Sequence, residues 1–256
     1  MIADRESSAG KFGVGATVLA IDAGNTRIKW GVHDGVRWIE QGAVDTARAA
    51  GLATALARRP PARTVVVSNV AGLALRAKIR RALPRRPAPR WIKSTRAQCG
   101  VRNSYVRPSQ LGSDRWAALI GAQRLYRGPA IVVNAGTALT ADALSGDGVF
   151  LGGIIVPGVE LMRKTLAGNT AALRPQPGRF SVFPTATGDA IVSGTIDTLC
   201  GAIERMARFL ENTGQAAPRC VLSGGGAAQL APHLNLEVKV VDNLVLEGLL
   251  TIAREG

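Results

Sequence analysis

Asp22-Ala23-Gly24-Asn25-Thr26 directly follows the apolar run Val18-Leu19-Ala20-Ile21. An apolar run that ends in such a sequence is typical of a buried strand entering a tight turn. Gly24 has no Cβ, so backbone N–H groups here can approach a phosphate. Asn25 and Thr26 can donate hydrogen bonds, and Asp22 can hold Mg²⁺ directly or through water. The stretch predicts a phosphate-binding turn, although an ordinary loop would have the same local sequence.

A second copy of this pattern occurs about half a chain later. Ile131-Val132-Val133 leads into Asn134-Ala135-Gly136-Thr137, and both copies continue into a further strand and an Asp/Gly turn. A third glycine-rich turn, 223–226, follows the strand-like run 220–222. The repeat predicts an internal duplication with two phosphate turns, and a chance match of a short motif is the alternative.

Strands and helices alternate along the rest of the chain, which predicts an α/β fold. Residues 1–16 mix charge, Ser and Gly and are predicted to form a flexible extension. The two halves are then expected at 17–118 and 119–256. Further strands are predicted at 64–68 and 150–156, and helices at 46–58, 73–83, 111–126, 159–166, 191–210 and 244–253.

The composition and charge of the chain argue against some classes of function. The chain has 256 residues, 46% of them hydrophobic, and a net charge of +14. No window approaches the roughly 18 apolar residues of a membrane span, so a cytoplasmic protein without a membrane partner is expected. A basic surface could attract nucleic acid, but arginines on solvated faces are the favoured explanation of the charge. Aromatic residues make up only 4% and do not interleave with the arginines, so no nucleic-acid partner is expected.

Asp114 lies just inside the start of a predicted helix, where the helix dipole stabilises a carboxylate. A carboxylate in this position can act as a general base toward a substrate hydroxyl. Arg115 beside it can bind a carboxylate or a phosphoryl group. A first-turn Asp followed by a solvated Arg is the equally frequent structural explanation. From spacing alone the two explanations remain open.

Two phosphate turns on a duplicated α/β frame resemble the ribonuclease-H-like halves of the actin, acetate kinase and sugar kinase superfamily, with ATP in the cleft between them. Within it, the chain is similar to the type III pantothenate kinases, a subset of which is known as Bvg accessory factors. The motifs that carry this resemblance span roughly residues 17 to 254 and are Asp22–Lys29, Tyr105, Gly112-Ser113-Asp114-Arg115, Gly136-Thr137-Ala138, Gly152-Gly153-Ile154, Pro157-Gly158, Thr187–Ile191 and Ser193-Gly194.

The resemblance implies transfer of the ATP γ-phosphoryl group to the primary hydroxyl of pantothenate, giving 4'-phosphopantothenate, the first step of coenzyme A biosynthesis. It implies Mg²⁺ with ATP, a homodimer, and Asp114 as the catalytic proton acceptor. The implied ATP-binding residues are Asp22, Ala23, Gly24, Asn25, Thr26, Arg27, Ile28, Lys29 and Thr137, and the implied pantothenate-binding residues are Tyr105, Gly112, Ser113, Asp114, Arg115 and Thr187.

Asn134 departs from the family pattern, which has Asp at a position that helps to bind K⁺ or NH₄⁺. Asn keeps a carbonyl oxygen but loses the charge, so a weakened monovalent-cation site is expected. Two other functions remain as alternatives. One is a transcription-linked regulator that uses the arginine-rich stretch 76–96, and the other is a kinase for another small alcohol.

Overall fold

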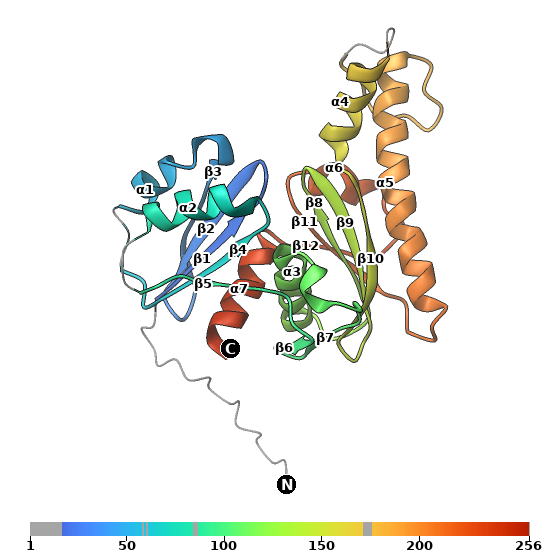
Figure 1. Cartoon of the computed structure of the whole chain (residues 1–256). Helices are drawn as coiled ribbons and strands as arrows, with labels where there is room; N and C mark the ends of the chain where they lie inside the picture. The colour runs from blue at the N-terminus through green and yellow to red at the C-terminus, as the bar shows by residue number, and fades with distance from the viewer. Residues whose placement is uncertain (1–16, 58, 60, 84–86, 171–175, 256) are drawn as a thin grey trace.

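The structure is a computed structural model and describes residues 17–57, 59, 61–83, 87–170 and 176–255. It contains two β-sheets with helices between them and on their outer faces (Figure 1). The extension predicted for residues 1–16 lies outside the described residues.

The first sheet forms around the strand that leads into the phosphate turn. Its order is β3-β2-β1-β4-β5. β1 pairs antiparallel with β2 and parallel with β4, while β3 and β5 lie at the edges. The strand after the Asp/Gly turn at 34–35 is β3, which starts at Trp38 and pairs antiparallel with β2. The bounds are β1 (Val18–Ala23), β2 (Arg27–His33), β3 (Trp38–Asp45), β4 (Thr64–Asn69) and β5 (Arg90–Trp91).

The second sheet repeats this topology. Its order is β12-β11-β8-β9-β10-β7-β6, and β8 pairs antiparallel with β9 and parallel with β11. β8 and β9 also have the same alternation of buried and exposed residues as β1 and β2. The predicted duplication is therefore confirmed. The bounds are β6 (Ala97–Gln98), β7 (Val101–Asn103), β8 (Ala130–Ala135), β9 (Ala138–Leu144), β10 (Val149–Pro157), β11 (Arg219–Ser223) and β12 (Val238–Val240).

Strands β6 and β7 extend the second sheet at its β10 edge, although they precede every other strand of that sheet in sequence. The boundary expected between residues 118 and 119 falls inside helix α3 (Ser113–Leu125). The chain thus passes from one sheet to the other between β5 and β6, ahead of that helix.

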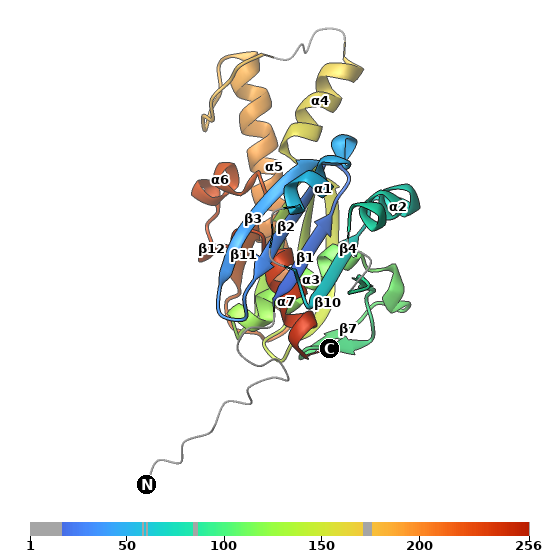
Figure 2. The same cartoon turned by 90° about the vertical axis from the view of Figure 1, so that its left-hand side faces the viewer.

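Helices α3 and α7 (Leu244–Glu255) lie between the two sheets and form the central core with both (Figures 1 and 2). The period of two in β1 explains this arrangement: Val18 and Ala20 face these helices, whereas Leu19 and Ile21 face the opposite side. The outer helices are α1 (Gly51–Leu56) and α2 (Gly72–Ala82) on the first sheet, and α5 (Thr187–Glu211) and α6 (Ala227–Leu230) on the second.

Two glycines allow α3 and α7 to approach closely. A Cβ placed on Gly248 would lie 1.7 Å from the Ala117 carbonyl oxygen, and one on Gly121 would lie 2.7 Å from that of Leu244. A side chain at either glycine would therefore push the two helix backbones apart and break their contact.

Helix α4 (Val159–Asn169) and the adjoining part of α5 project beyond the body of the molecule (Figures 1 and 2). A cavity of about 590 Å³ lies between them, lined by Met162 and Leu166 of α4 and Thr187 and Ile191 of α5. Within the described residues, every helix is too short or too polar to cross a bilayer.

Candidate active site

The predicted phosphate turn connects β1 to β2 at the carboxyl end of β1. The Gly24 amide donates to the Arg27 carbonyl at 3.1 Å, which closes the turn. Thr46, at the end of β3, braces it: its hydroxyl donates to the Gly24 carbonyl at 2.8 Å and its amide to that of Thr26 at 2.9 Å. Asn25 and Thr26 are exposed, so their polar groups are available to a ligand.

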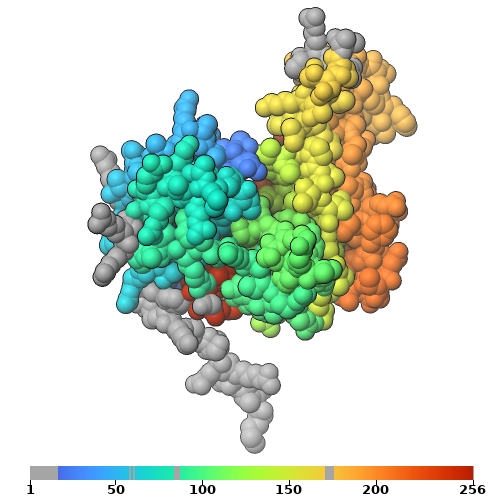
Figure 3. All heavy atoms as spheres, viewed as in Figure 1, coloured from blue at the N-terminus to red at the C-terminus, as the bar shows by residue number. Residues whose placement is uncertain are grey.

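The second turn, between β8 and β9, lies against the first. The hydroxyl oxygens of Thr26 and Thr137 are 2.7 Å apart. Gly158 donates its amide to Thr137, and a Cβ at Gly158 would lie 2.1 Å from the Gly136 oxygen, so only glycine fits. The third glycine-rich turn supports this one, since the Gly226 amide donates to Ala135. The structure thus brings the two turns together, beside the recess between the N-terminal half and α4 (Figure 3).

Asp114 is the second residue of α3. The start of this helix is tied to the first sheet, because the Ser113 and Ser68 hydroxyls are 2.9 Å apart and Ser68 lies beside Asp22 in the parallel β1–β4 pair. A Cβ at Gly112 would lie 2.5 Å from Asp114 Oδ1, so this glycine leaves room for the carboxyl group. The predicted base therefore lies at the carboxyl end of β1 and β4, where ligands bind in such sheets.

Both carboxyl groups at this edge have raised pKa values. Burial, and then the charge of Asp114, raise the pKa of Asp22 to about 7 against the opposing effect of Lys29. Burial also raises the pKa of Asp114, while the Arg115 amide, which donates to Asp114 Oδ1 at 2.8 Å, and the Arg115 charge oppose that shift. Two carboxylates near each other with raised pKa values are typical of a functional site.

Asp22 fits a divalent cation. Its Oδ1 atom is buried and has no hydrogen-bond partner among the described residues. A cation there would satisfy this oxygen and offset the repulsion from Asp114. Within the same residues, no group of three or more His, Cys, Asp or Glu side chains gathers to hold a metal ion. A divalent cation such as Mg²⁺ usually takes only one or two protein carboxylates, together with substrate phosphates.

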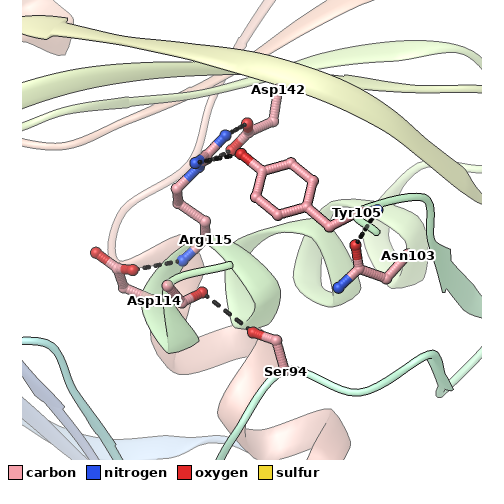
Figure 4. A network of polar contacts seen from close by, with 7 residues as sticks. Ser94, Asn103, Tyr105, Asp114, Arg115 and Asp142 are labelled. Atoms are coloured by element: carbon pink, nitrogen blue, oxygen red, sulfur yellow. Dashed lines mark hydrogen bonds and ion pairs between the residues drawn. The ribbon is translucent and has the colours of Figure 1, made fainter. Parts of the chain in front are cut away.

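Arg115 is held by Asp142 of β9, a residue that sequence reasoning did not single out (Figure 4). Its Nε donates to Asp142 Oδ2 at 3.1 Å and its Nη2 donates to Oδ1. Its Nη1 donates to the Tyr105 hydroxyl at 3.2 Å, and the Tyr105 ring packs against Phe150. The structure therefore brings Tyr105, Asp114 and Arg115 together. The available signal was an Asp within the apolar strand 138–144, since a buried charge needs a partner.

Other residues expected at the site lie elsewhere or face away. The Ile28 and Ala23 side chains are buried in the core of the first half, so only their backbone faces the turn. Lys29 pairs across the strands with Asp22, while Arg27 is exposed. Thr187 lines the cavity between α4 and α5, and the hydrogen bonds of Tyr105 and Arg115 within the described residues do not include it.

Sequence comparisons identify related proteins. The profile of the family "Type III pantothenate kinase" matches residues 18–208. A type III pantothenate kinase from Nitrosospira multiformis is 50% identical over 244 residues, covering 93% of this chain and 91% of that protein. One from Aromatoleum aromaticum is 52% identical over 239 residues, covering 93% and 98%.

Structure comparisons give the fold. A Campylobacter jejuni protein named for the Baf family of transcriptional activators superposes with a TM-score of 0.56 at 20% identity, covering 91% of this chain and 96% of that one. The activator of 2-hydroxyisocaproyl-CoA dehydratase from Clostridium difficile, solved with bound ADPNP, gives 0.51 at 13% identity, covering 93% and 92%. At these identities the likeness extends to the duplicated fold alone.

Proposed function

Since the chain belongs to the type III pantothenate kinase family, we propose that its two facing turns bind ATP and that the cluster at the start of α3 binds pantothenate. The reaction is transfer of the ATP γ-phosphoryl group to the primary hydroxyl of pantothenate. The observation that carries the proposal is the proximity of Asp114 to Asp22, whose pKa it raises. A base beside a phosphate turn is the arrangement that phosphoryl transfer to an alcohol requires.

The triphosphate lies between residues 22–29 and Thr137. The backbone of the first turn and the hydroxyls of Thr26 and Thr137 donate hydrogen bonds to it, in place of the bond that the two hydroxyls share. The family uses ATP with a divalent metal, and we assign Mg²⁺ to Asp22 because of its unpartnered oxygen. Bound there, the ion would neutralise part of the charge on the triphosphate.

Asp114 accepts the proton of the attacking hydroxyl. Its raised pKa makes it a stronger base than an ordinary Asp, while the Arg115 amide and the Arg115 charge favour its ionised form. Arg115 and the Tyr105 hydroxyl bind the pantothenate carboxylate, while Gly112 and Ser113 shape the start of the helix. The base is thus held beside both substrates, which is the main contribution a protein makes to this reaction.

The protein is proposed to be a cytoplasmic homodimer that associates through α4 and the segment before α5. Each of these two segments has apolar side chains that are exposed: Leu161 and Leu166 in α4, and Val182 and Phe183 before α5, the last at 86% exposure. Exposed apolar patches often mark subunit interfaces. The separation of Thr187 from the Arg115 cluster supports the same arrangement, since a second subunit could bring this residue to a pantothenate site.

The substrate is tested by measuring ADP formation with pantothenate and with a panel of sugars and acetate. We expect kcat/KM for pantothenate to exceed that for each sugar and for acetate by more than about 100-fold, because buried polar groups reject substrates that leave them unpaired. Preference for a sugar or acetate would identify a kinase for another small molecule. Absence of turnover with pantothenate would overturn the proposal.

A further inference from the structure

The guanidinium group of Arg115 is almost entirely enclosed. Arg115 is 6% exposed and Asp142 only 1%. Their two parallel hydrogen bonds form the bidentate pairing that fixes a guanidinium in plane and in rotation. Because both groups are out of water, neither side chain can adopt another rotamer without leaving a buried charge unpaired.

Gly153 of β10 makes room for this pair. It lies opposite Asp142 in the antiparallel pairing of β9 and β10. A Cβ at this position would lie 2.0 Å from Asp142 Oδ1 and 2.9 Å from Arg115 Nη2. Any other residue at 153 would therefore displace the carboxylate, the guanidinium or the strand.

The remaining donors of Arg115 are limited in number. A guanidinium has five N–H groups, and three of them are taken by Asp142 and the Tyr105 hydroxyl. Among the described contacts, one N–H group on Nη1 and one on Nη2 remain. Two N–H groups on neighbouring nitrogens match the two oxygens of a carboxylate. Asp142 also balances the charge of Arg115. Binding of a carboxylate by Arg115 therefore depends on the directions of these two N–H groups more than on net charge.

We propose that Asp142 is a positioning residue for the acid substrate: it holds Arg115 so that the guanidinium presents its two remaining N–H groups to the carboxylate. Gly153 provides the space for this arrangement. The proposal rests on the proposed function, in which that carboxylate belongs to pantothenate. It predicts that loss of Asp142 impairs recognition of the carboxylate and leaves phosphoryl transfer intact.

The test compares pantothenate with pantothenol, in which a hydroxymethyl group replaces the carboxylate. For the wild type we expect kcat/KM to favour pantothenate by about 10- to 100-fold, as for hydrogen bonds to a charged group. Asp142→Asn should raise KM for pantothenate about tenfold or more and bring the two substrates close together. KM for ATP and kcat with pantothenol should stay within about twofold. Asp147→Asn, which removes the exposed pair with Arg102, is the matched control and should change neither.

Each outcome decides the matter. An equal loss with both substrates, or an unchanged KM for pantothenate, would assign Asp142 a structural role and overturn the proposal. If Asp142→Asn does not fold, Gly153→Ala, which keeps the carboxylate but displaces the pair, decides by the same ratio. A wild type that shows no preference for pantothenate over pantothenol also overturns it. A wild type without activity on pantothenate overturns the proposed function instead.

Discussion

Asp114 is close enough to Asp22 for its charge to oppose ionisation of the Asp22 carboxyl group, and both residues are partly buried. Such a pair reduces the stability of the free protein, since each carboxylate disfavours the ionised form of its neighbour. A bound cation would offset this cost. The pair proposed to act in catalysis is therefore expected to cause a local loss of stability.

Asp22→Asn is expected to stabilise the protein without nucleotide or divalent metal. The pKa of Asp22 rises from 3.8 to about 7 on folding, so the native state takes up a proton between these values and its stability falls as pH increases through them. The substitution removes this penalty. At about pH 8 the variant should have a higher Tm than the wild type, and its free energy of unfolding should be larger by on the order of a few kcal/mol. Both differences should shrink toward about pH 4.

Asp34→Asn is a control in which the change in stability with pH should have the opposite sign, because the pKa of Asp34 is lowered on folding. The amides of Arg37 and Val36 donate to Asp34 and lower its pKa, so its ionised form stabilises the folded state above the unfolded pKa. This variant should lose stability at about pH 8 and lose less at low pH. A lower Tm for Asp22→Asn at high pH would contradict the account of the carboxyl pair.

Asn134 occupies, at the end of β8, the position that Asp22 occupies at the end of β1. Each lies beside a Ser on the parallel neighbour, Ser223 and Ser68. Because Asn134 has no charge, we expect initial rates in K⁺ or NH₄⁺ to exceed those in Na⁺ by less than about threefold. Asn134→Asp should strengthen that dependence, and equal behaviour of the two proteins would remove position 134 from cation binding.

The strand–turn–strand units could be predicted from the sequence because their signals are local. The repeat of Asp22-Ala23-Gly24 at Asn134-Ala135-Gly136 required only a short apolar run and a glycine, and both hairpins formed as expected. The long helices were also found, because their apolar residues recur at helical spacing. Helix α5 begins at Thr187, four residues before the predicted start, since Gly188 interrupts the pattern.

Other elements carry no periodic signal. β5, β6 and β12 have two or three residues, too few to show alternation, and they exist because a neighbouring strand offers hydrogen bonds. The attachment of β6 and β7 to the second sheet is likewise a tertiary contact. The same holds for the Asp142–Arg115 pair, whose members are 27 positions apart and meet only through packing of α3 on β9.

The contact between α3 and α7 gives a prediction for helix packing. Gly248→Ala should lower stability by about 1–3 kcal/mol or more, because the new Cβ would overlap the Ala117 carbonyl and force the helices apart. Gly201→Ala in α5, where nothing lies within 4 Å of the added Cβ, should instead be stabilising by about 0.5–1 kcal/mol. Chemical denaturation of both variants checks this, and equal effects would contradict the packing argument.

The projection formed by α4 and α5 gives the molecule an asymmetric outline (Figure 1). If two copies associate through it, sedimentation should give a mass twice that of one chain. Phe183→Ser should shift the protein toward the monomer and lower kcat/KM for pantothenate. Val36→Ser, at another highly exposed apolar residue in the turn after β2, should leave the dimer intact. A wild-type monomer with full activity would contradict the proposed assembly.

The net charge of +14 belongs to the molecule as a whole. This charge is compatible with the alternative function, a transcription-linked regulator that uses the arginine-rich stretch 76–96. Residues 84–86 of that stretch lie outside the described residues. Binding to DNA through that stretch would weaken steeply with salt, because it would rest on phosphate neutralisation. The two facing turns and the carboxyl pair Asp22–Asp114 would have no role in such binding, whereas the proposed kinase reaction needs both.

The central claim, that a base at the start of α3 acts on an alcohol beside the phosphate turn, is tested most directly by pantothenate-dependent ADP formation in the wild type and in Asp114→Asn. We expect kcat to fall by about 10²–10⁴-fold in a variant that folds normally, with KM for ATP little changed, because a positioned base contributes about this much. Near-normal turnover of folded Asp114→Asn would contradict the claim.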